Sequence, residues 1–196
     1  MNKTLDYYDR QAQEFIQATI NADMSCMQRH FLTYIKRGGR ILDLGCGSGR
    51  DSKMFLDAGY KVVSVDGSLQ MCRAAEMLTG QEAVHSTFQA YAPSGVFDGI
   101  WACASLLHLE RTEICRVVKK LLFSLRKGGC FYMSFKYGTF SGERNGRFFT
   151  DMTEDILHVV LSGITGLELV DVAITDDVRP TRAHEKWLNA YFKRTL

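Results

Sequence analysis

The chain has 196 residues, of which 46% are hydrophobic and 23% charged, and its formal net charge is +2 at pH 7. This length suits one domain with a sizeable core, and the nearly balanced charge argues against a general binder of nucleic acids or anionic membranes. No apolar run approaches the ~20 residues that cross a bilayer, and the first 15 residues lack the apolar core of a signal peptide. Six cysteines without a Cys-x-x-Cys pair predict reduced thiols in a cytoplasmic protein.

Short apolar runs and helical patterns alternate along the first part of the chain. The runs predict strands at 40–45, 61–66, 83–88 and 97–103. Helices are expected from Arg50 to Gly59 and from Ser68, a suitable N-cap, to Gly80.

The second part continues this alternation and then changes. Apolar residues from Ile114 to Leu125 mark one face of a helix that Gly128 and Gly129 close, and a strand follows at 130–135. Asp151 and Glu154 resemble a capping box at the start of another helix. Two strands, 167–175 and 187–194, then follow each other without a helix between them.

This order of elements predicts an α/β fold. Strands that alternate with helices form a doubly wound, mainly parallel sheet with helices on both faces. The last two strands add an antiparallel pair at one edge. The loop at 136–149 is too long for a simple connection, and loops of this length are often functional.

The segment ILDLGCGSGR, residues 41–50, places a glycine loop after the first strand, where such sheets bind ligands. A dinucleotide fingerprint would need a third small residue where Arg50 stands. Asp43, two residues before Gly45, would repel a pyrophosphate and would suit an amine or a sulfonium. The pattern therefore argues against a nicotinamide site.

Asp66 ends the second predicted strand, 21 residues after Gly45. A carboxylate at that place can accept hydrogen bonds from the two hydroxyls of a ribose. A ligand with a ribose, a positive charge and no pyrophosphate fits S-adenosylmethionine.

Four segments in order resemble the motifs of class I S-adenosylmethionine-dependent methyltransferases, a Rossmann-like family. They are ILDLGCGSGRDS, VVSVDGS, FDGIWACASLLHL and LRKGGCFYMSF, which lie within residues 38–135, and WLNAYFKR extends the resemblance more loosely. The resemblance implies that Gly45 and Gly47 pass under the methionine part of the cofactor, and that Asp66 holds its ribose.

Further cofactor contacts are implied by the same resemblance. Tyr8, with Tyr7 beside it, matches an N-terminal lid, which makes residues 1–36 a helical lid and residues 37–196 the methyltransferase domain. The loops at 136–150 and 175–186 would cover the substrate. The remaining implied contacts involve the adenine, its edge and the methionyl group, and they fall to Ser68, Met71, Phe88, Gln89 and Cys103. Gln89-Ala90 departs from the acid that the family often places near the adenine amine.

A general base is needed only for an acceptor that must lose a proton, and histidine is the usual choice. His108, just past the fourth predicted strand, is the best-placed candidate, although the sequence favours a histidine that merely closes this turn over a base. Tyr137 and Lys136 are weaker candidates, and His184 would have to be brought in by its loop.

Several acceptor classes lack their motifs. The Asn/Asp-Pro-Pro-Tyr/Phe motif of amino-group methyltransferases is replaced by 102–105, and no Pro-Cys nucleophile for cytosine C5 occurs. Carboxylates are absent after the fourth and fifth predicted strands, so we expect no metal.

Cationic and aromatic residues gather in the loops. Arg144 and Arg147 lie beside Phe148 and Phe149, and the segment 179–194 adds further cations. Such a rim suits a carboxylate or phosphate of a small substrate, an RNA backbone, or solvent alone. The sequence favours a cytoplasmic methyltransferase for a small molecule, with an RNA- or protein-modifying enzyme and a non-catalytic partner subunit as the alternatives.

Overall fold

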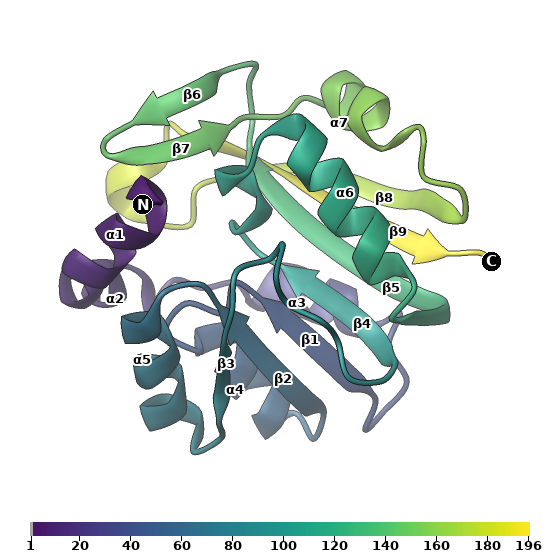
Figure 1. Cartoon of the computed structure of the whole chain (residues 1–196), viewed down its shortest axis with the longest axis horizontal. Coiled ribbons are helices and arrows are strands. Elements are labelled where there is room, and N and C mark those ends of the chain that lie inside the picture. Colours follow the sequence, from purple (N-terminus) through teal and green to yellow (C-terminus); the bar gives the residue numbers. More distant parts are fainter. Residues whose placement is uncertain (1) are drawn as a thin grey trace.

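The structure is a computed structural model that describes residues 2–196. A seven-stranded sheet with the strand order β3-β2-β1-β4-β5-β9-β8 runs through it (Figure 1). The strands are β1 (Arg40–Leu44), β2 (Lys61–Asp66), β3 (Ala83–His85), β4 (Phe97–Ala102), β5 (Leu125–Lys136), β8 (Leu167–Asp176) and β9 (Lys186–Arg194). Neighbouring strands from β3 to β5 are parallel, whereas β9 is antiparallel to both β5 and β8. The predicted doubly wound sheet with an antiparallel edge pair is confirmed.

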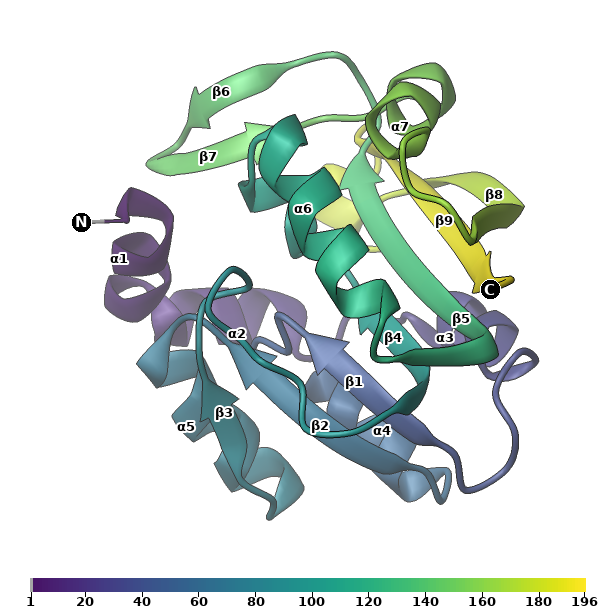
Figure 2. The same cartoon turned by 45° about the vertical axis from the view of Figure 1, so that its right-hand side comes forward.

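Helices cover both faces of this sheet (Figure 2). They are α1 (Lys3–Arg10), α2 (Ala12–Thr19), α3 (Ser25–Leu32), α4 (Arg50–Asp57), α5 (Leu69–Thr79), α6 (Arg111–Leu122) and α7 (Glu154–Leu161), with short 3₁₀ turns η1 (Leu106–His108) and η2 (Pro180–Arg182). None of these helices in residues 2–196 is both long and apolar enough to span a bilayer.

Two apolar clusters hold the helices to the sheet. On one face Phe31 of α3 and Phe55 of α4 pack against Trp101 and Tyr132, whose rings stack with centroids 3.9 Å apart. On the other face α6 and α7 bury the apolar stripes that their 3.6-residue periodicity predicted. Because the strands are covered on both sides, β4 is buried along its whole length.

The ends of α4 and α5 show why the glycines lie where they do. Ser68 caps α5 by accepting a hydrogen bond from the Met71 N–H, as predicted, and Gly80 ends that helix in a left-handed conformation. A Cβ on Gly49 would lie 2.9 Å from the Cα of Ala75, so glycine allows the start of α4 to approach α5 closely.

Several predicted boundaries are wrong. β3 ends at His85 rather than at residue 88, and the chain then turns toward the end of the sheet. α6 ends at Leu122, and Gly128 and Gly129 belong to β5. There a Cβ on Gly129 would lie 2.7 Å from the carbonyl oxygen of Asp98, so this glycine serves strand pairing instead of ending a helix.

The predicted loop after β5 contains a two-stranded hairpin of its own. Its strands are β6 (Ser141–Arg144) and β7 (Arg147–Thr150). Asp151, expected at a helix cap, is paired with Arg144 of this hairpin at 2.7 Å, and Thr153 caps α7 in its place.

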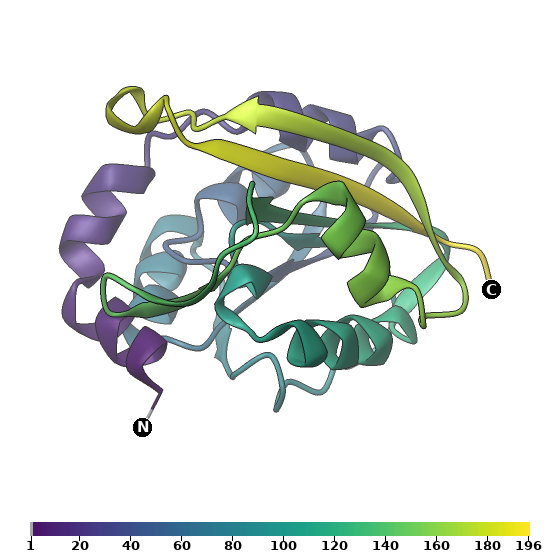
Figure 3. The same ribbon diagram turned by 90° about the horizontal axis from the view of Figure 1, so that it is seen from above.

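The N-terminal helices lie at the end of the sheet near the hairpin (Figure 3). Lys3 pairs with Glu143 of β6 at 2.8 Å, and the Oγ1 of Thr4 accepts a hydrogen bond from the Phe148 N–H. On the other side of α1, Asp9 accepts a hydrogen bond of 2.6 Å from the Ser68 hydroxyl. α1 therefore connects the hairpin with the start of α5, whereas α3 is part of the core.

Candidate active site

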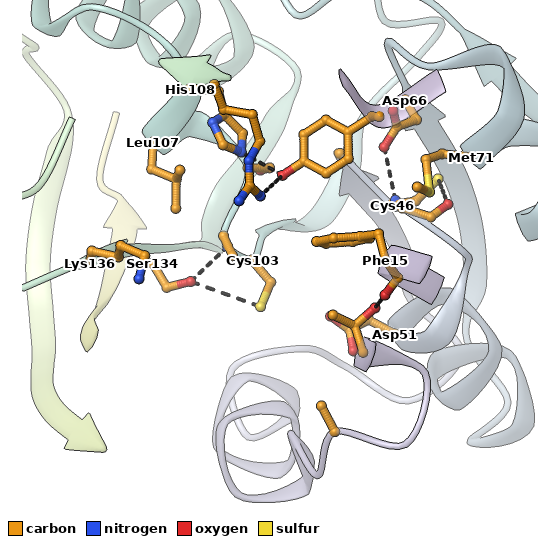
Figure 4. A pocket seen from close by; sticks show the side chains of 18 of the residues that line it. Phe15, Cys46, Asp51, Asp66, Met71, Cys103, Leu107, His108, Ser134 and Lys136 are labelled. Carbon is orange, nitrogen blue, oxygen red and sulfur yellow. Dashed lines mark hydrogen bonds between the residues drawn. The ribbon is translucent and has the colours of Figure 1, made fainter. Parts of the chain in front are cut away.

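A cavity with a volume of about 220 Å³ lies at the carboxyl ends of the parallel strands (Figure 4). Its floor is formed by the glycine loop and the ends of β2, β4 and β5. Side chains of α1 and α2, the β6–β7 hairpin and the linker between β8 and β9 form its walls. This is the place at which open α/β sheets bind ligands.

The glycine loop is pinned to the second strand. The backbone N–H of Gly45 donates to the carbonyl of Val65 at 2.8 Å, and that of Gly47 donates to the Asp66 carboxylate at 2.9 Å. Both glycines have positive φ angles, 79° and 55°. A Cβ on Gly45 would lie 2.3 Å from the Cβ of Ser105, whereas one on Gly47 would meet nothing within 4 Å.

Asp66 ends β2 at the cavity wall. One carboxylate oxygen accepts from Gly47 and the other from the Ser68 N–H, at 2.9 and 2.8 Å. Burial raises the pKa of Asp66, while the backbone donors Ser68 and Gly47 lower it. Each oxygen can accept a second hydrogen bond, so this carboxylate has the capacity to hold two neighbouring hydroxyls.

Asp43, expected to face a cationic ligand, does not line the cavity. It is buried under the glycine loop, where it accepts a 2.6 Å hydrogen bond from the Ser52 hydroxyl, which also contacts Ser64. Burial, together with the nearby Asp51 carboxylate, raises the pKa of Asp43 to about 8. At the end of a buried parallel strand its side chain points into the helix layer, so it supports the loop from below.

Arg50 lines the cavity, but its guanidinium is already engaged. It forms two hydrogen bonds with Asp51, of 2.8 and 3.0 Å, and a third of 3.2 Å with the Thr19 carbonyl of α2. Burial lowers the pKa of Arg50, but the carboxylate outweighs it, and the net pKa is raised. Asp51 also accepts from Gln28 and from the Trp101 indole, both at 2.8 Å, so this cation is held rigidly.

The residues expected near an adenine divide into two groups. Met71, Phe88 and Gln89 line the cavity. Ser68 does not, because its hydroxyl is buried between the Met71 N–H and Asp9, where it caps α5.

Cys103 follows β4 and lines the cavity beside Ser134 (Figure 4). Burial, strengthened by the Asp51 carboxylate, raises the pKa of this thiol to about 12. A thiol with so high a pKa is a poor nucleophile. The Ser134 hydroxyl accepts from the Ala104 N–H at 2.8 Å, which fixes the backbone after β4.

His108 and Tyr8 meet in the cavity. Nδ1 of His108 lies 2.7 Å from the carbonyl oxygen of Phe148, which can only accept, so Nδ1 carries the proton. Nε2 therefore accepts from the Tyr8 hydroxyl at 2.8 Å, and Arg147 donates to the same hydroxyl oxygen at 3.3 Å. Burial lowers the pKa of His108 to about 4, which keeps the ring neutral.

The other acid–base candidates are Lys136, Tyr137 and His184, and only the first of them lines the cavity. Lys136 lines the cavity, whereas the next residue, Tyr137, points to the other side of the strand, is 39% exposed and interacts with Glu154. His184 is exposed and also lies outside the lining. The structure therefore groups only Lys136 of these three with His108.

Sequence reasoning missed several lining residues. The hydroxyl of Ser105 is buried in the lining without a hydrogen-bond partner in the described chain. Phe15 of α2 packs edge-on against Tyr8, with ring centroids 5.0 Å apart. Asp177, Trp187 and Asn189 line the cavity from the β8–β9 linker and β9. The segment WLNAYFKR marked this strand, but it gave no role to these side chains. Within residues 2–196, no three His, Cys, Asp or Glu side chains are grouped to hold a metal ion.

The family model described as "Methyltransferase domain" matches residues 41–129, which contain the glycine loop, Asp66 and Cys103. This segment of the chain is similar to methyltransferase domains, in agreement with the resemblance of its motifs. Among solved structures, the 1,6-didemethyltoxoflavin-N1-methyltransferase of Burkholderia thailandensis, which holds 1,6-didemethyltoxoflavin and S-adenosylhomocysteine, has a TM-score of 0.77. It is 20% identical, and the match covers 98% of this chain and 85% of that chain. This similarity confirms the Rossmann-like methyltransferase fold.

The chain also matches curated methyltransferases in sequence. The 2-methyl-6-phytyl-1,4-hydroquinone methyltransferase of Synechocystis sp. is 29% identical over 60% of this chain and 38% of its own length. The cypemycin N-terminal methyltransferase of Streptomyces sp. is 30% identical over 49% of this chain and 41% of its own length. The chain thus spans about two fifths of each of these relatives.

Proposed function

We propose that this methyltransferase transfers the methyl group of S-adenosylmethionine to a small-molecule acceptor. One observation carries the proposal: a single cavity is lined both by the glycine loop with Asp66 and by His108, Tyr8 and Arg147. The first set suits a nucleoside, and the second suits a polar acceptor. The small heterocycle bound by the Burkholderia enzyme supports an acceptor of this size.

The residues of the first set fit S-adenosylmethionine. Asp66 has free acceptor capacity for the ribose hydroxyls, and Met71 and Phe88 offer apolar contacts to a purine ring. The open space over Gly47 lets the ligand approach the backbone. Arg50 uses three of its five N–H donors on Asp51 and Thr19, and the two that remain can serve the carboxylate of the methionine part.

Bound S-adenosylmethionine would supply a methyl group on a sulfonium, an electrophile that needs no further activation. The protein has to align the acceptor with that methyl group and exclude water. We infer that α1 and α2 act as the cover, because Leu5, Tyr8 and Phe15 project from them into the cavity. α3 is part of the body, so the cover is shorter than residues 1–36.

His108 is the proposed proton acceptor for substrates that lose a proton. Its Nε2 is unprotonated, and the Tyr8 hydroxyl lies on it at 2.8 Å. A proton can therefore reach Nε2 through Tyr8, which would pass on its own proton and accept one from the acceptor. An acceptor that is already nucleophilic needs no such step.

Calorimetry with the purified protein tests the cofactor assignment. We expect S-adenosylmethionine and S-adenosylhomocysteine to bind and NADH not to bind. Asp66→Asn should weaken both sulfur ligands, whereas Asp57→Asn, an exposed carboxylate on α4 paired with Lys53, should not. Binding of NADH alone would refute the proposal.

A screen of small acceptors then tests catalysis. The expected result is formation of S-adenosylhomocysteine that depends on one class of small molecule. Turnover only with bulk tRNA, with a steep dependence on salt, would identify an RNA-modifying enzyme instead. Turnover only in the presence of a partner protein would identify the chain as a subunit.

A further inference from the structure

Cationic side chains gather on the acceptor side of the cavity. Lys136 at the end of β5, Arg147 of β7, and Arg179 and Arg182 of the β8–β9 linker all line it. These residues come from three separate segments, so the fold and not a local sequence motif brings them together.

Too few carboxylates accompany them. Arg179 pairs with Asp177 at 2.5 Å, and Arg182 pairs with Glu185 at 2.7 Å. Lys136 contacts the second oxygen of the same Glu185. The two carboxylates of Asp177 and Glu185 therefore pair with three cations, and Arg147 is a fourth cation without a carboxylate in the part of the chain that the structure describes.

Arg147 has no carboxylate within 4.0 Å in residues 2–196. Its Nε is buried without a hydrogen-bond partner, and its only side-chain hydrogen bond there runs to the Tyr8 hydroxyl at 3.3 Å. The guanidinium carbon lies 4.4 Å from the ring centre of Tyr7 and 5.0 Å from that of Phe149. The aromatic rings hold the guanidinium in place, and its capacity to donate remains largely unused.

The surplus charge affects the neighbouring groups. Burial, together with Arg182 and Arg144, lowers the pKa of Lys136 to about 8. Burial and Arg179 likewise lower the pKa of Arg182, with smaller effects of Arg147 and Arg144. Like charges held this close destabilise one another, and a bound anion would relieve that repulsion.

We propose that these cations form a subsite for an oxyanion of the methyl acceptor, a carboxylate or a phosphate, with Arg147 as its principal ligand. Guanidinium groups bind both anions through paired N–H donors. This inference rests on the proposed function and specifies its acceptor as an anionic small molecule. Lys136 and Arg182 complete the subsite from the opposite segments.

The carboxylate of the cofactor is the competing anion. Arg50 is placed for it, because Arg50 lies beside the glycine loop and contacts α2. Arg147 instead lies on the hairpin, next to Tyr8 and His108. A test must therefore separate the two anions.

The experiment uses full-length protein saturated with S-adenosylhomocysteine and measures the binding of three probes by calorimetry. Benzoate and phenyl phosphate carry the oxyanion, and benzamide is the neutral control of similar shape. We expect at least one anion to bind tenfold or more tightly than benzamide, and the tighter of the two identifies the anion. Arg147→Gln should remove this preference, and Arg147→Lys should restore part of it.

Arg111→Gln is the matched control, because Arg111 also has a buried Nε without a partner but lies outside the cavity. It should leave all three affinities unchanged. Equal affinity for the anions and benzamide would overturn the inference, and so would full anion binding by Arg147→Gln. Neither result would affect cofactor binding, so neither would contradict the proposed function. Loss of S-adenosylhomocysteine affinity in Arg147→Gln, with 5′-methylthioadenosine unaffected, would assign Arg147 to the cofactor carboxylate and also overturn it.

Discussion

The Tyr8 hydroxyl lies 2.8 Å from Nε2 of His108, 100 residues further along the chain. This hydrogen bond joins α1 to the turn after β4. Arg147 donates to the same hydroxyl, which therefore lies between the imidazole ring and the guanidinium. The Phe148 carbonyl fixes the tautomer of His108, and the Tyr8 contact holds α1 over the cavity.

Tyr8→Phe should lower the free energy of unfolding. It leaves the buried Nε2 of His108 without a donor, at a cost of about 1–3 kcal/mol. Denaturant unfolding at pH 7.5 measures the change. Tyr7→Phe is the control, because Tyr7 packs on the same Arg147 without a side-chain hydrogen bond to His108. Equal stability of both variants would show that the contact contributes nothing.

The stability of the protein should fall as the pH drops from about 6.5 to about 4. In this window the unfolded chain binds a proton on His108 and the folded chain does not, because burial keeps the pKa of His108 at about 4. Each pH unit then costs about 1.4 kcal/mol at most. Thermal unfolding of His108→Gln should show a flatter pH profile there, and His158→Gln, on an exposed site of α7, should match the wild type.

Asp43→Asn should stabilise the protein at pH 7.5 and leave it unchanged at pH 3.5. The pKa of Asp43 is raised to about 8 in the folded protein, whereas in the unfolded chain it is about 3.9. Between these two pH values the unfolded chain has released the proton and the folded chain has kept it. Stability is therefore lost as the pH rises through that window, and asparagine removes this loss. S-Adenosylhomocysteine affinity should change far less than in Asp66→Asn. A comparable loss would indicate direct contact between Asp43 and the cofactor.

Gly45→Ala should destabilise the protein for two reasons. A left-handed alanine costs about 1–2 kcal/mol, and the contact with Ser105 adds overpacking of about 1–3 kcal/mol. Gly59→Ala isolates the first cost, because its φ is 85° and a Cβ there meets nothing within 4 Å. Ser105→Gly should restore part of the stability of Gly45→Ala. A double mutant no more stable than Gly45→Ala would disprove the contact.

The sequence predicted the parallel sheet well because each strand carries its own signal. The apolar run of β1, the cap at Ser68 and the stripe on α6 are local patterns with local physical causes. For the same reason the placement of the glycine loop and Asp66 at one end of the sheet could be predicted from chain order alone.

The rest depends on tertiary packing. Whether Lys136 or Tyr137 faces the cavity is decided by the register of β5, which a loop-like sequence does not reveal. Asp43 and Ser68 carry the right chemistry but are used within the protein. The cations on the acceptor side meet only after the hairpin and the β8–β9 linker have folded over the sheet.

The position of α1 has a practical consequence for kinetic work. Its first turn is tied to Glu143 and Phe148, and its last turn is tied to Ser68. We expect that ligands enter beneath α1, so that their exchange requires these contacts to open. A fusion tag joined ahead of Asn2 would be attached next to α1 and would slow the opening of this helix. The other end of the chain emerges from β9 on the far side of the molecule (Figure 1). A tag placed there leaves exchange rates undisturbed, and a comparison of the two tagged proteins reports how fast this helix opens.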